Sequence, residues 1–526
     1  MKTRTILLSA AFALAMQPAL AAEPKKGGTL TIIADVTPRH FNSAVQSGVA
    51  TMEPGAQLFA TLLRIDGKFN FHPYLATDWQ VADDGKSMTL HLVKGAKFHD
   101  GTDITSQDVA FSLLANRDNH PFKAMFSPLE AVETPDDHTV VLKLKSAHPA
   151  IMLALTAPLS PIIPKHIYGD GQDLKTHPRN TENVVGSGPF ILKEFKRREH
   201  IILERNPNNF QEPAYLDQIV YRNFGQTASQ VIALEQGQAD MIGWNSHIQS
   251  LKRLKKVEHL TVTGDHYVAI GPNSWLAFNT ARKPMNDVRV RKAIAYAIDR
   301  KFIVKALHAG FSPESTGPIV PGTPFYTADV EMYDVDLDKA NALLDEAGYK
   351  RGADGMRFSL KVDYLPSARI DDHQKNVAEY MKPQLKKVGI DVAVRVSADF
   401  PTWANYVRNW DFDITMDLPF NWGDPVIGVH RTYLSSNIVK GVIWSNTQNY
   451  ANAEVDKLLS MAAVELDQAK RKDLYTRFQK IVVDELPVYP INVLPYYTIY
   501  NNTTVSGVPD TVWGLAHPLD RVYKLK

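Results

Sequence analysis

A secretory signal stands at the start of this chain, and no cysteine follows it anywhere in the 526 residues. Lys2 and Arg4 form a basic segment, residues 6–16 form an apolar one, and residues 19–21 read Ala-Leu-Ala, a small-residue cleavage site. The apolar segment is too short to cross a bilayer, so the pattern predicts a signal peptide that is removed after Ala21. Without cysteine, the exported chain has no disulfides, thiolate nucleophiles or cysteine metal ligands, so its stability must come from packed cores.

The residue after the predicted cleavage site is Ala22, whereas lipoprotein signals place a cysteine there. We therefore expect a protein without a lipid anchor, outside the cytoplasm, in the periplasm of a Gram-negative cell. About 505 residues remain after cleavage, which is enough for two or three packed domains. Loss of Lys2 and Arg4 changes the formal net charge from +1 to −1. This balance gives no electrostatic reason to expect nucleic acid or an anionic membrane as a partner.

Hydrophobic patterns along the chain predict an α/β protein. The runs with strand-like alternation or strand-like composition are residues 29–33, 87–93, 139–145, 358–362, 390–396 and 412–416. In the second half these runs alternate with helical patterns, an order that favours a lobe built from βαβ units.

Side chains that cap helices mark where several helices begin. Thr105 and Asp108 predict one helix start, Asp287 a second, and Asp336 or Asp338 a third. Residues 373–388 also read as a helix, which Pro383 should bend or interrupt. Residues 454–483 read as two helices.

Motifs spread along almost the whole exported chain resemble one protein family. Residues 97–101 read Lys-Phe-His-Asp-Gly and are followed by Thr105, Asp108-Val109 and Phe111-Ser112; residues 186–190 read Gly-Ser-Gly-Pro-Phe. Further on come Phe278-Asn279-Thr280, Asp287-Val288-Arg289-Val290-Arg291 and, near the end, Leu474-Tyr475 with Pro487. Together, in this order, they resemble the extracellular solute-binding proteins of the dipeptide, oligopeptide and nickel class.

The resemblance implies a two-lobe α/β fold in which a hinge lets the lobes close on a ligand, with an extra α+β domain inserted in the first lobe. The signal peptide would occupy residues 1–21 and the first lobe residues 22–54, 205–282 and 499–526. The inserted domain would occupy residues 55–204 and the second lobe residues 283–498.

The function implied is capture of a peptide or peptide-like solute and its delivery to an inner-membrane ABC importer with permease and ATPase subunits. Non-peptide solutes remain open as alternatives: an opine or amino-acid conjugate, an oligosaccharide or a metal chelate. Relatives of this class usually work as monomers. The chain has no Gly-x-x-x-x-Gly-Lys-Ser/Thr stretch, which agrees with ATP hydrolysis on a partner.

Peptide-binding relatives hold the ligand's α-amino group with an aspartate four residues before the proline of an Asp-Pro pair. In this chain the pair is Asp424-Pro425, and the matching position is Asn421. A buried ammonium opposite a neutral amide has no charge partner, which argues against a free amino group at this position. Asp417 or Asp424 are alternative partners for such a group.

Further ligand-binding candidates follow from the resemblance and from residue chemistry. Arg369 lies in a segment, residues 364–369, from which dipeptide binders offer an arginine to the ligand's carboxylate, and a guanidinium gives that group two parallel donors. Trp275 and Trp422 are candidate walls of the cleft because aromatic faces bury much ligand area. Gln46 and Ser47 follow the first strand, where the first lobe should face the ligand.

Nothing in the sequence predicts catalytic residues, a cofactor or a metal centre. A periplasmic hydrolase is the weaker alternative, because the chain has neither a Gly-x-Ser-x-Gly elbow nor a His-Glu-x-x-His motif. An envelope chaperone that holds unfolded segments in the cleft is another. We therefore expect a receptor and not an enzyme.

Overall fold

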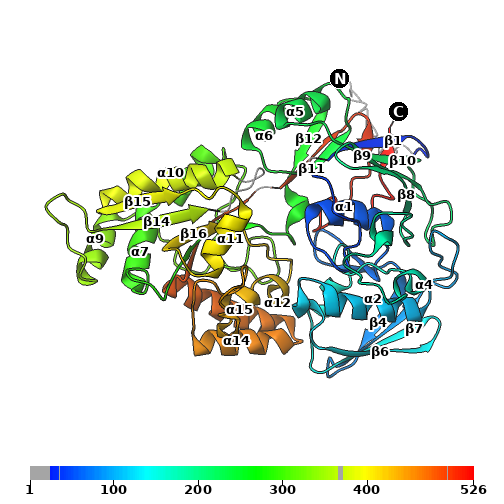
Figure 1. The fold of residues 1–526 in the computed structure, drawn as a ribbon, viewed down its shortest axis with the longest axis horizontal. Helices are drawn as coiled ribbons and strands as arrows, with labels where there is room; N and C mark the ends of the chain where they lie inside the picture. Colours follow the sequence, from blue (N-terminus) through cyan, green and yellow to red (C-terminus); the bar gives the residue numbers. More distant parts are fainter. Residues whose placement is uncertain (1–23, 35, 365–370, 495, 526) are drawn as a thin grey trace, which may run out of the picture.

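The computed structural model describes residues 24–34, 36–364, 371–494 and 496–525 (Figure 1). The predicted signal peptide and the candidate ligand-binding residue Arg369 lie outside these residues. Two lobes lie side by side, with both ends of the described chain on the same lobe, and a smaller domain adjoins that lobe. Among the described residues, no helix combines the length and the apolar character that a bilayer span requires.

The first lobe is built on a sheet with the strand order β12-β18-β11-β1-β10-β9-β8. Its strands are β1 (Thr29–Ile33), β8 (Phe190–Lys196), β9 (His200–Arg205), β10 (Gln218–Arg222), β11 (Met241–Asn245), β12 (Leu260–Thr263) and β18 (Tyr497–Asn501). Its helices are α1 (Val49–Leu58), α5 (Thr227–Glu235) and α6 (Ile248–Leu254). Because β1 is parallel to both β10 and β11, the carboxyl ends of these three strands lie at one edge of the sheet.

The inserted domain packs a sheet of order β4-β5-β7-β6 against helix α2 (Ser106–Asn119). The strands are β4 (Ala76–Val81), β5 (Ser87–Leu92), β6 (Leu129–Asp136) and β7 (Thr139–Leu144), and a hairpin of β2 (Leu63–Ile65) and β3 (Phe71–Pro73) precedes them. Short helices complete it: η1 (Lys123–Met125), α3 (Ile151–Ala154), α4 (Lys165–Tyr168) and η2 (Pro178–Asn180). The alternating burial of β5 and β7 fits strands with one face on the core.

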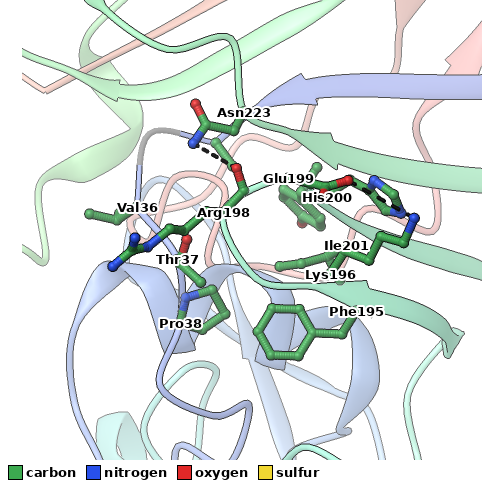
Figure 2. A pocket seen from close by; sticks show the side chains of 12 residues that line it. Val36, Thr37, Pro38, Phe195, Lys196, Arg198, Glu199, His200, Ile201 and Asn223 are labelled. Atoms are coloured by element: carbon green, nitrogen blue, oxygen red, sulfur yellow. Dashed lines mark hydrogen bonds and ion pairs between the residues drawn. The ribbon is translucent and has the colours of Figure 1, made fainter.

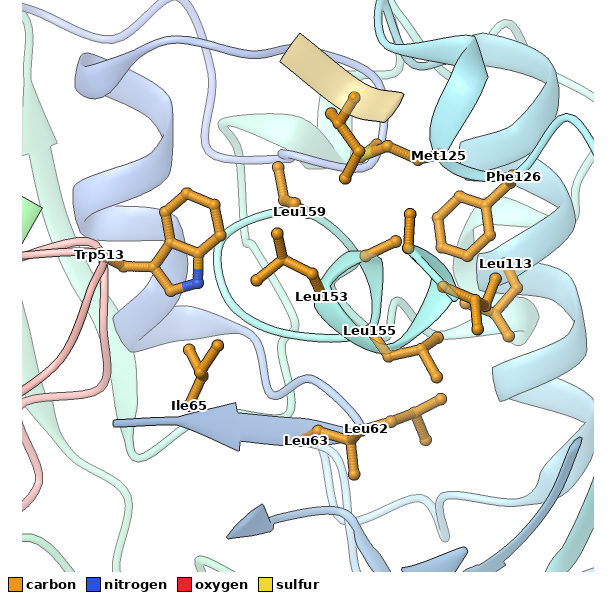
Figure 3. Packing of buried hydrophobic residues seen from close by; sticks show 14 of the residues in the cluster. Leu62, Leu63, Ile65, Leu113, Met125, Phe126, Leu153, Leu155, Leu159 and Trp513 are labelled. Carbon is orange, nitrogen blue, oxygen red and sulfur yellow. The ribbon is translucent and has the colours of Figure 1, made fainter. Parts of the chain in front are cut away.

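The C-terminal tail completes the core of the inserted domain. Figure 3 shows the indole of Trp513 among Ile65, Leu153 and Leu159. The Trp513 Nε1–H donates to Oγ1 of Thr156 at 3.0 Å. The tail also contains the short strands β19 (Val505–Ser506) and β20 (Tyr523–Lys524).

The second lobe has a sheet of order β15-β14-β16-β13-β17 in which β14 is parallel to β15 and β16. Its strands are β13 (Asn273–Phe278), β14 (Phe358–Tyr364), β15 (Ile390–Arg395), β16 (Ile414–Asp417) and β17 (Val488–Val493). The helices beside this sheet are α7 (Val288–Ala297), α8 (Arg300–Phe302), η4 (Ile303–Leu307), α9 (Leu337–Glu346), α10 (Asp371–Lys387) and α11 (Phe400–Arg408). A second group of helices contains α12 (Pro425–Gly428), α13 (His430–Tyr433), η5 (Ser435–Asn437), α14 (Ala453–Val464) and α15 (Gln468–Glu485).

The chain crosses between the lobes from β12 to β13, by way of η3 (Asp265–Tyr267), and again from β17 to β18. Strand pairing differs from the expected boundaries at three places. β8 and β9 pair in the sheet of the first lobe, although the inserted domain was expected to extend to residue 204. β13 pairs in the sheet of the second lobe, which was expected to begin at residue 283, and β18, which contains residue 498, pairs in that of the first.

The predicted helix starts are confirmed by their capping bonds. Asp108 accepts a hydrogen bond from the Thr105 backbone N–H at 2.9 Å, and Asp287 accepts one from Arg289 N–H at 2.9 Å. Asp336, and not Asp338, caps α9 by accepting from Lys339 N–H at 2.8 Å. Pro383 does not interrupt the helix as one of the two expected effects required, since α10 continues through it.

Candidate functional site

The first lobe, the inserted domain and the second lobe meet in one buried apolar cluster. Its second-lobe members are Leu418, Trp422, Val426 and Ile427, its inserted-domain members include Met125, Phe126 and Leu153, and Trp244 and Tyr267 come from the first lobe and the crossing that leaves it. We call this set the inter-lobe cluster. Burial of apolar surface holds the lobes together here, and their separation would expose these side chains to water.

Aromatic rings form a continuous chain of contacts through this cluster. The ring pairs, with centroid separations, are Phe122–Trp422 at 4.5 Å, Phe420–Trp422 at 5.6 Å, Phe420–Tyr496 at 6.2 Å, Trp244–Tyr496 at 5.6 Å and Trp244–Tyr267 at 4.7 Å. We call these six residues the aromatic belt. It connects the inserted domain, the second lobe and the first lobe, so it lies where a ligand between the lobes would be enclosed.

Two tryptophans of the belt have unusual backbone geometry. Trp244 has φ +56° and Trp422 has φ +53°, a left-handed conformation that bulky residues rarely adopt. Strain of this kind is retained mainly where the position of a side chain matters for function. The buried indole Nε1–H of Trp244 also has no hydrogen-bond partner among the described residues.

Asn421 lies between the crossing segment and the loop that follows residue 317. Its Oδ1 accepts a hydrogen bond from Val320 N–H at 2.9 Å, and its Nδ2 donates to the Pro318 carbonyl at 3.1 Å. Its backbone N–H donates to the Ile270 carbonyl at 3.0 Å. The amide side chain is therefore engaged with the protein backbone in this arrangement.

Asp424 forms a buried, bidentate ion pair with Arg471. The two N–O distances are 2.8 and 2.9 Å, and Oδ1 also caps α12 by accepting from Val426 N–H at 2.9 Å. Burial opposes ionisation of Asp424, but the Arg471 charge and hydrogen bonds lower its pKa below the ordinary value. Both carboxylate oxygens thus have partners inside the second lobe.

The remaining predicted site residues lie in both lobes. Trp275 is buried on β13, and its indole Nε1–H has no partner among the residues described. Gln46 and Ser47 are half-buried in the loop between β1 and α1, and Gln46 Nε2 donates to Oγ1 of Thr51 at 3.2 Å. That loop follows the carboxyl end of β1, the edge at which ligands bind in open parallel sheets.

A pocket lies between the inserted domain and the second lobe. It encloses about 690 Å³ of space, part of it open to solvent. Phe69, Phe71 and Leu153 line it from the inserted domain, and Phe325 and Gly423 from the second lobe. The Asp424–Arg471 pair forms part of its lining, so its polar wall carries no net charge.

Two smaller hollows lie on the first lobe. One lies near the carboxyl ends of β1, β10 and β11 and is lined by Trp244. The other lies between residues 36–38 and the β8–β9 turn (Figure 2). Figure 2 shows Asn223 Nδ2 donating to the Arg198 carbonyl at 3.1 Å behind it. This second hollow lies away from the aromatic belt.

Asp417 and Arg431 are two charged residues of this region that influence each other's pKa without forming an ion pair. Asp417 ends β16, and its carboxylate accepts a hydrogen bond from Leu418 N–H at 2.6 Å. Burial raises its pKa to about 6. Arg431 lies on α13, where burial lowers its pKa to about 10 although the Asp417 charge opposes this.

His120 supports the belt from the inserted domain. Its Nδ1 accepts a hydrogen bond from Phe122 N–H at 3.0 Å, which requires that nitrogen to be unprotonated. Burial lowers the His120 pKa to about 3. Among the described residues, no group of three or more histidine, aspartate or glutamate side chains is arranged to hold a metal ion.

The chain is similar to known proteins over nearly all of its length. A model of the family described as bacterial extracellular solute-binding proteins, family 5 Middle, matches residues 70–440. The oligopeptide-binding protein AppA of Bacillus subtilis is 28% identical over 96% of this chain and 92% of its own length. The heme-binding protein A of Haemophilus influenzae is 29% identical over 81% of this chain and 79% of its own length.

The solved structure of AppA from Bacillus subtilis in complex with a nonapeptide has the same fold. It is 25% identical, superposes with a TM-score of 0.79, and the alignment covers 96% of this chain and 100% of that one. The predicted two-lobe α/β architecture is thereby confirmed.

Proposed function

Because this chain belongs to the family 5 bacterial extracellular solute-binding proteins, we propose that it captures a peptide or peptide-like solute between its lobes and delivers it to an ABC importer. The observation that carries the proposal is the inter-lobe cluster, in which side chains from both lobes and the inserted domain form one contiguous apolar surface. A solute that replaces water between such surfaces favours the closed arrangement, and closure strengthens its polar contacts.

A peptide fits this site chemically. The aromatic belt offers flat apolar faces that accept side chains of many shapes at low entropic cost. The relative AppA is named as an oligopeptide-binding protein, and its solved structure contains a nonapeptide. The heme-binding relative supports the alternative of a non-peptide solute on the same aromatic surface.

Individual side chains have proposed roles in this capture. We propose Trp275 and Trp422 as walls of the cleft, Gln46 and Ser47 as polar contacts from the first lobe, and Arg369 as a donor to the ligand's carboxylate. Asn421 and Asp424 contribute by fixing the loop around Trp422, through their bonds to Val320 and Arg471. None of these roles requires a reaction, so we propose a receptor and not an enzyme.

The proposed domain division follows strand pairing. Of the residues that the structure describes, the first lobe contains those within 24–58, 190–263 and 497–525, the inserted domain residues 59–189, and the second lobe those within 273–493. The described residues between β12 and β13 and between β17 and β18 are the crossings at which the lobes would move relative to each other.

The proposed location is the periplasm, after removal of residues 1–21 and without a lipid anchor, because Ala22 offers no thiol for acylation. The partners are the permease and ATPase subunits of the importer, which would recognise the closed form of the receptor. The proposed receptor acts as a monomer.

Native mass spectrometry of the protein purified gently from the periplasm tests the function. Release and fragmentation of the bound solute should give a ladder of peptide masses on a one-to-one complex. A single non-peptide mass would establish the alternative solute class. Unfolded protein segments, or turnover products of an added substrate, would overturn the receptor proposal.

A further inference from the structure

The inserted domain and the second lobe approach each other closely at two glycines. At Gly423, an added β-carbon would lie 2.8 Å from Cδ2 of Leu153 and 3.4 Å from Cε1 of Phe69. At Gly85, in the turn between β4 and β5, an added β-carbon would lie 2.9 Å from both Cδ atoms of Leu466. Only a residue without a side chain lets the two parts come this close without displacing a neighbour.

The pocket of about 690 Å³ is bordered by both of these contacts. Gly423 is part of its lining, and so is Gln468, two residues after Leu466. Packed protein interiors contain few hollows larger than a water molecule, so a hollow of this size beside two tight contacts needs an explanation. None of the six residues of the aromatic belt lines it, so the pocket is distinct from the surface on which the proposed solute would be held.

A strained hairpin turn places Phe69 in the wall of the pocket. Phe69 has φ +64°, a left-handed conformation that bulky residues rarely adopt. The carboxylate of Asp66 fixes the turn by accepting from Lys68 N–H at 2.8 Å and from Asn70 N–H at 2.9 Å. Strain of this kind persists mainly where the position of a side chain matters. Phe71, on β3 of the same hairpin, adds a second ring to this wall.

The second lobe supplies a preformed wall opposite the hairpin. Phe325 is buried there, and its carbonyl accepts a hydrogen bond from Gln479 Nε2 at 2.9 Å. The neighbouring Pro324 carbonyl accepts from Lys472 Nζ at 3.2 Å. The guanidinium of Arg471 lies 4.7 Å from the ring centre of Phe325. Because both walls are held in place by the protein, little ordering remains to be done when a ligand enters.

The charged groups that line the pocket are already paired with each other. Both Nη groups of Arg471 donate to Asp424, and its Nε donates to the Ala462 carbonyl at 2.9 Å. A charged ligand would lose its water here without gaining an unpaired opposite charge. Apart from the exposed amide of Gln468 and the backbone of Gly423, the rest of the lining is apolar: Phe69, Phe71, Pro149, Leu153, Pro324 and Phe325.

We propose that this pocket is a second binding site, which takes an uncharged aromatic molecule of one or two rings. The phenylalanine faces accept such rings in offset or edge-to-face contact, and the Gln468 amide can bond to a hydroxyl or carbonyl substituent. Because the walls come from the inserted domain and from the second lobe, the bound molecule holds these two parts together. The site goes beyond solute capture and gives the inserted domain a ligand of its own.

The first test uses 2-naphthol as the probe, with 2-naphthoate and 2-naphthylmethylammonium as its charged counterparts. Calorimetry on the protein, freed of solute by unfolding and refolding, should show one-to-one binding of 2-naphthol with a Kd below about 1 mM. The charged forms should bind at least about 10-fold more weakly. Absence of saturable 2-naphthol binding below about 1 mM overturns the proposal, and tighter binding of either charged form overturns the ligand class.

A variant of the strained turn tests the position of the site. Phe69→Gly removes a ring from the wall and relieves the left-handed strain, so it should fold, which circular dichroism checks. It should weaken 2-naphthol binding by about 10-fold or more. Arg198→Gly is the matched control, because Arg198 has φ +66° and is exposed outside the pocket. Unchanged binding in Phe69→Gly, or equal weakening in both variants, contradicts the assignment.

A second pair of variants answers the same question if Phe69→Gly does not fold. Phe71 and Phe210 are both half-buried on the same apolar core, but only Phe71 lines the pocket. Phe71→Ala should therefore weaken 2-naphthol binding by about 10-fold and Phe210→Ala should leave it unchanged. Crystals grown with 6-bromo-2-naphthol then locate the bromine by its anomalous scattering. Bromine found only at the aromatic belt would mean that the pocket is not a separate site.

An apolar side chain of a captured solute has the same chemistry as the probe, so a competition measurement distinguishes the two sources. The affinity for 2-naphthol should be the same in the presence and absence of a pronase digest of casein. Displacement of 2-naphthol by the digest would assign the pocket to the solute and overturn the second site. Failure of the second site leaves the proposed receptor function intact, because solute capture requires no ligand in this pocket.

Discussion

The ring of Trp422 in the second lobe lies 4.5 Å from the ring of Phe122 in the inserted domain, centroid to centroid, with the planes inclined by 51°. These residues are 300 positions apart in the sequence and belong to parts of the molecule with separate sheets. Their contact therefore reports directly on whether the lobes are together.

Replacement of Phe122 by alanine should favour the open arrangement. An aromatic pair contributes about 0.5–1.5 kcal/mol beyond the area it buries, so ligand affinity should fall by about 2- to 12-fold or more. Small-angle X-ray scattering should show a larger radius of gyration for the ligand-free variant. Phe358→Ala is the matched control, because Phe358 packs on Tyr349 within the second lobe, 5.0 Å between centroids. Equal effects of both variants would show that Phe122 acts only through overall stability.

Replacement of Asn421 by aspartate should destabilise the protein. The new carboxylate oxygen would face the Pro318 carbonyl, to which Nδ2 now donates, and this loses a buried hydrogen bond and adds repulsion. We expect a loss of about 1–3 kcal/mol in the free energy of unfolding, measured by urea denaturation. Asn502→Asp, at an exposed position, should change it by less than about 0.5 kcal/mol. A variant as stable as wild type would mean that the Asn421 bonds contribute little.

Removal of the Asp424 charge should be costly because Arg471 is left buried without its partner. Breaking a buried pair in this way costs about 3–5 kcal/mol, whereas an exposed pair is worth about 0–1 kcal/mol. Asp424→Asn should therefore lower the melting temperature far more than Asp484→Asn, which breaks the exposed pair with Lys292. The double variant Asp424→Asn, Arg471→Gln should recover part of the loss. Because asparagine can still cap α12, no recovery would contradict the assignment of the loss to the unpaired Arg471 charge.

Acid should destabilise the protein through His120. Its pKa is about 3 in the folded protein and about 6.5 when unfolded, so below pH 6.5 the unfolded chain binds a proton that the folded one does not. This contribution to stability is complete above pH 6.5 and is lost as the pH falls towards 3. The loss is about 2 kcal/mol at pH 5. His120→Asn keeps an acceptor for Phe122 N–H but cannot titrate, so its thermal stability should fall less between pH 7.5 and 5. Parallel profiles for the two proteins would contradict this.

Local sequence signals were sufficient for the helix starts and most strands. Asp287 and Asp336 cap helices as expected because capping depends on residues within one turn. An interruption at Pro383 was wrong, since α10 accommodates it within seventeen residues of continuous helix. The boundary expected at residue 204 missed the β8–β9 hairpin, because nothing local distinguishes strands that pair with β10 from those of the inserted sheet.

The candidate site was harder to predict because its chemistry depends on contacts between distant elements. The sequence suggested Asn421 from its position before the Asp-Pro pair, but not that Val320 and Pro318 would occupy its amide. The sequence suggested Asp417 only as an alternative partner for a ligand's amino group, and it did not suggest Arg431. Their relationship depends on α12 and on the placement of Phe122, which are tertiary features.

The contacts between the C-terminal tail and the inserted domain have a consequence for the order of folding. Three sets of contacts join residues 511–520 to residues 57–65. The Thr511 hydroxyl donates to the Ile65 carbonyl, and the Gln57 side chain donates to the His517 carbonyl and accepts from Leu519 N–H. Arg64 forms an ion pair with Asp520. Residues 511–520 thus complete a domain whose other parts are made several hundred residues earlier. A nascent chain cannot close that core before residues 511–520 have left the ribosome, which keeps the core unfolded for longer than its early position in the chain would suggest.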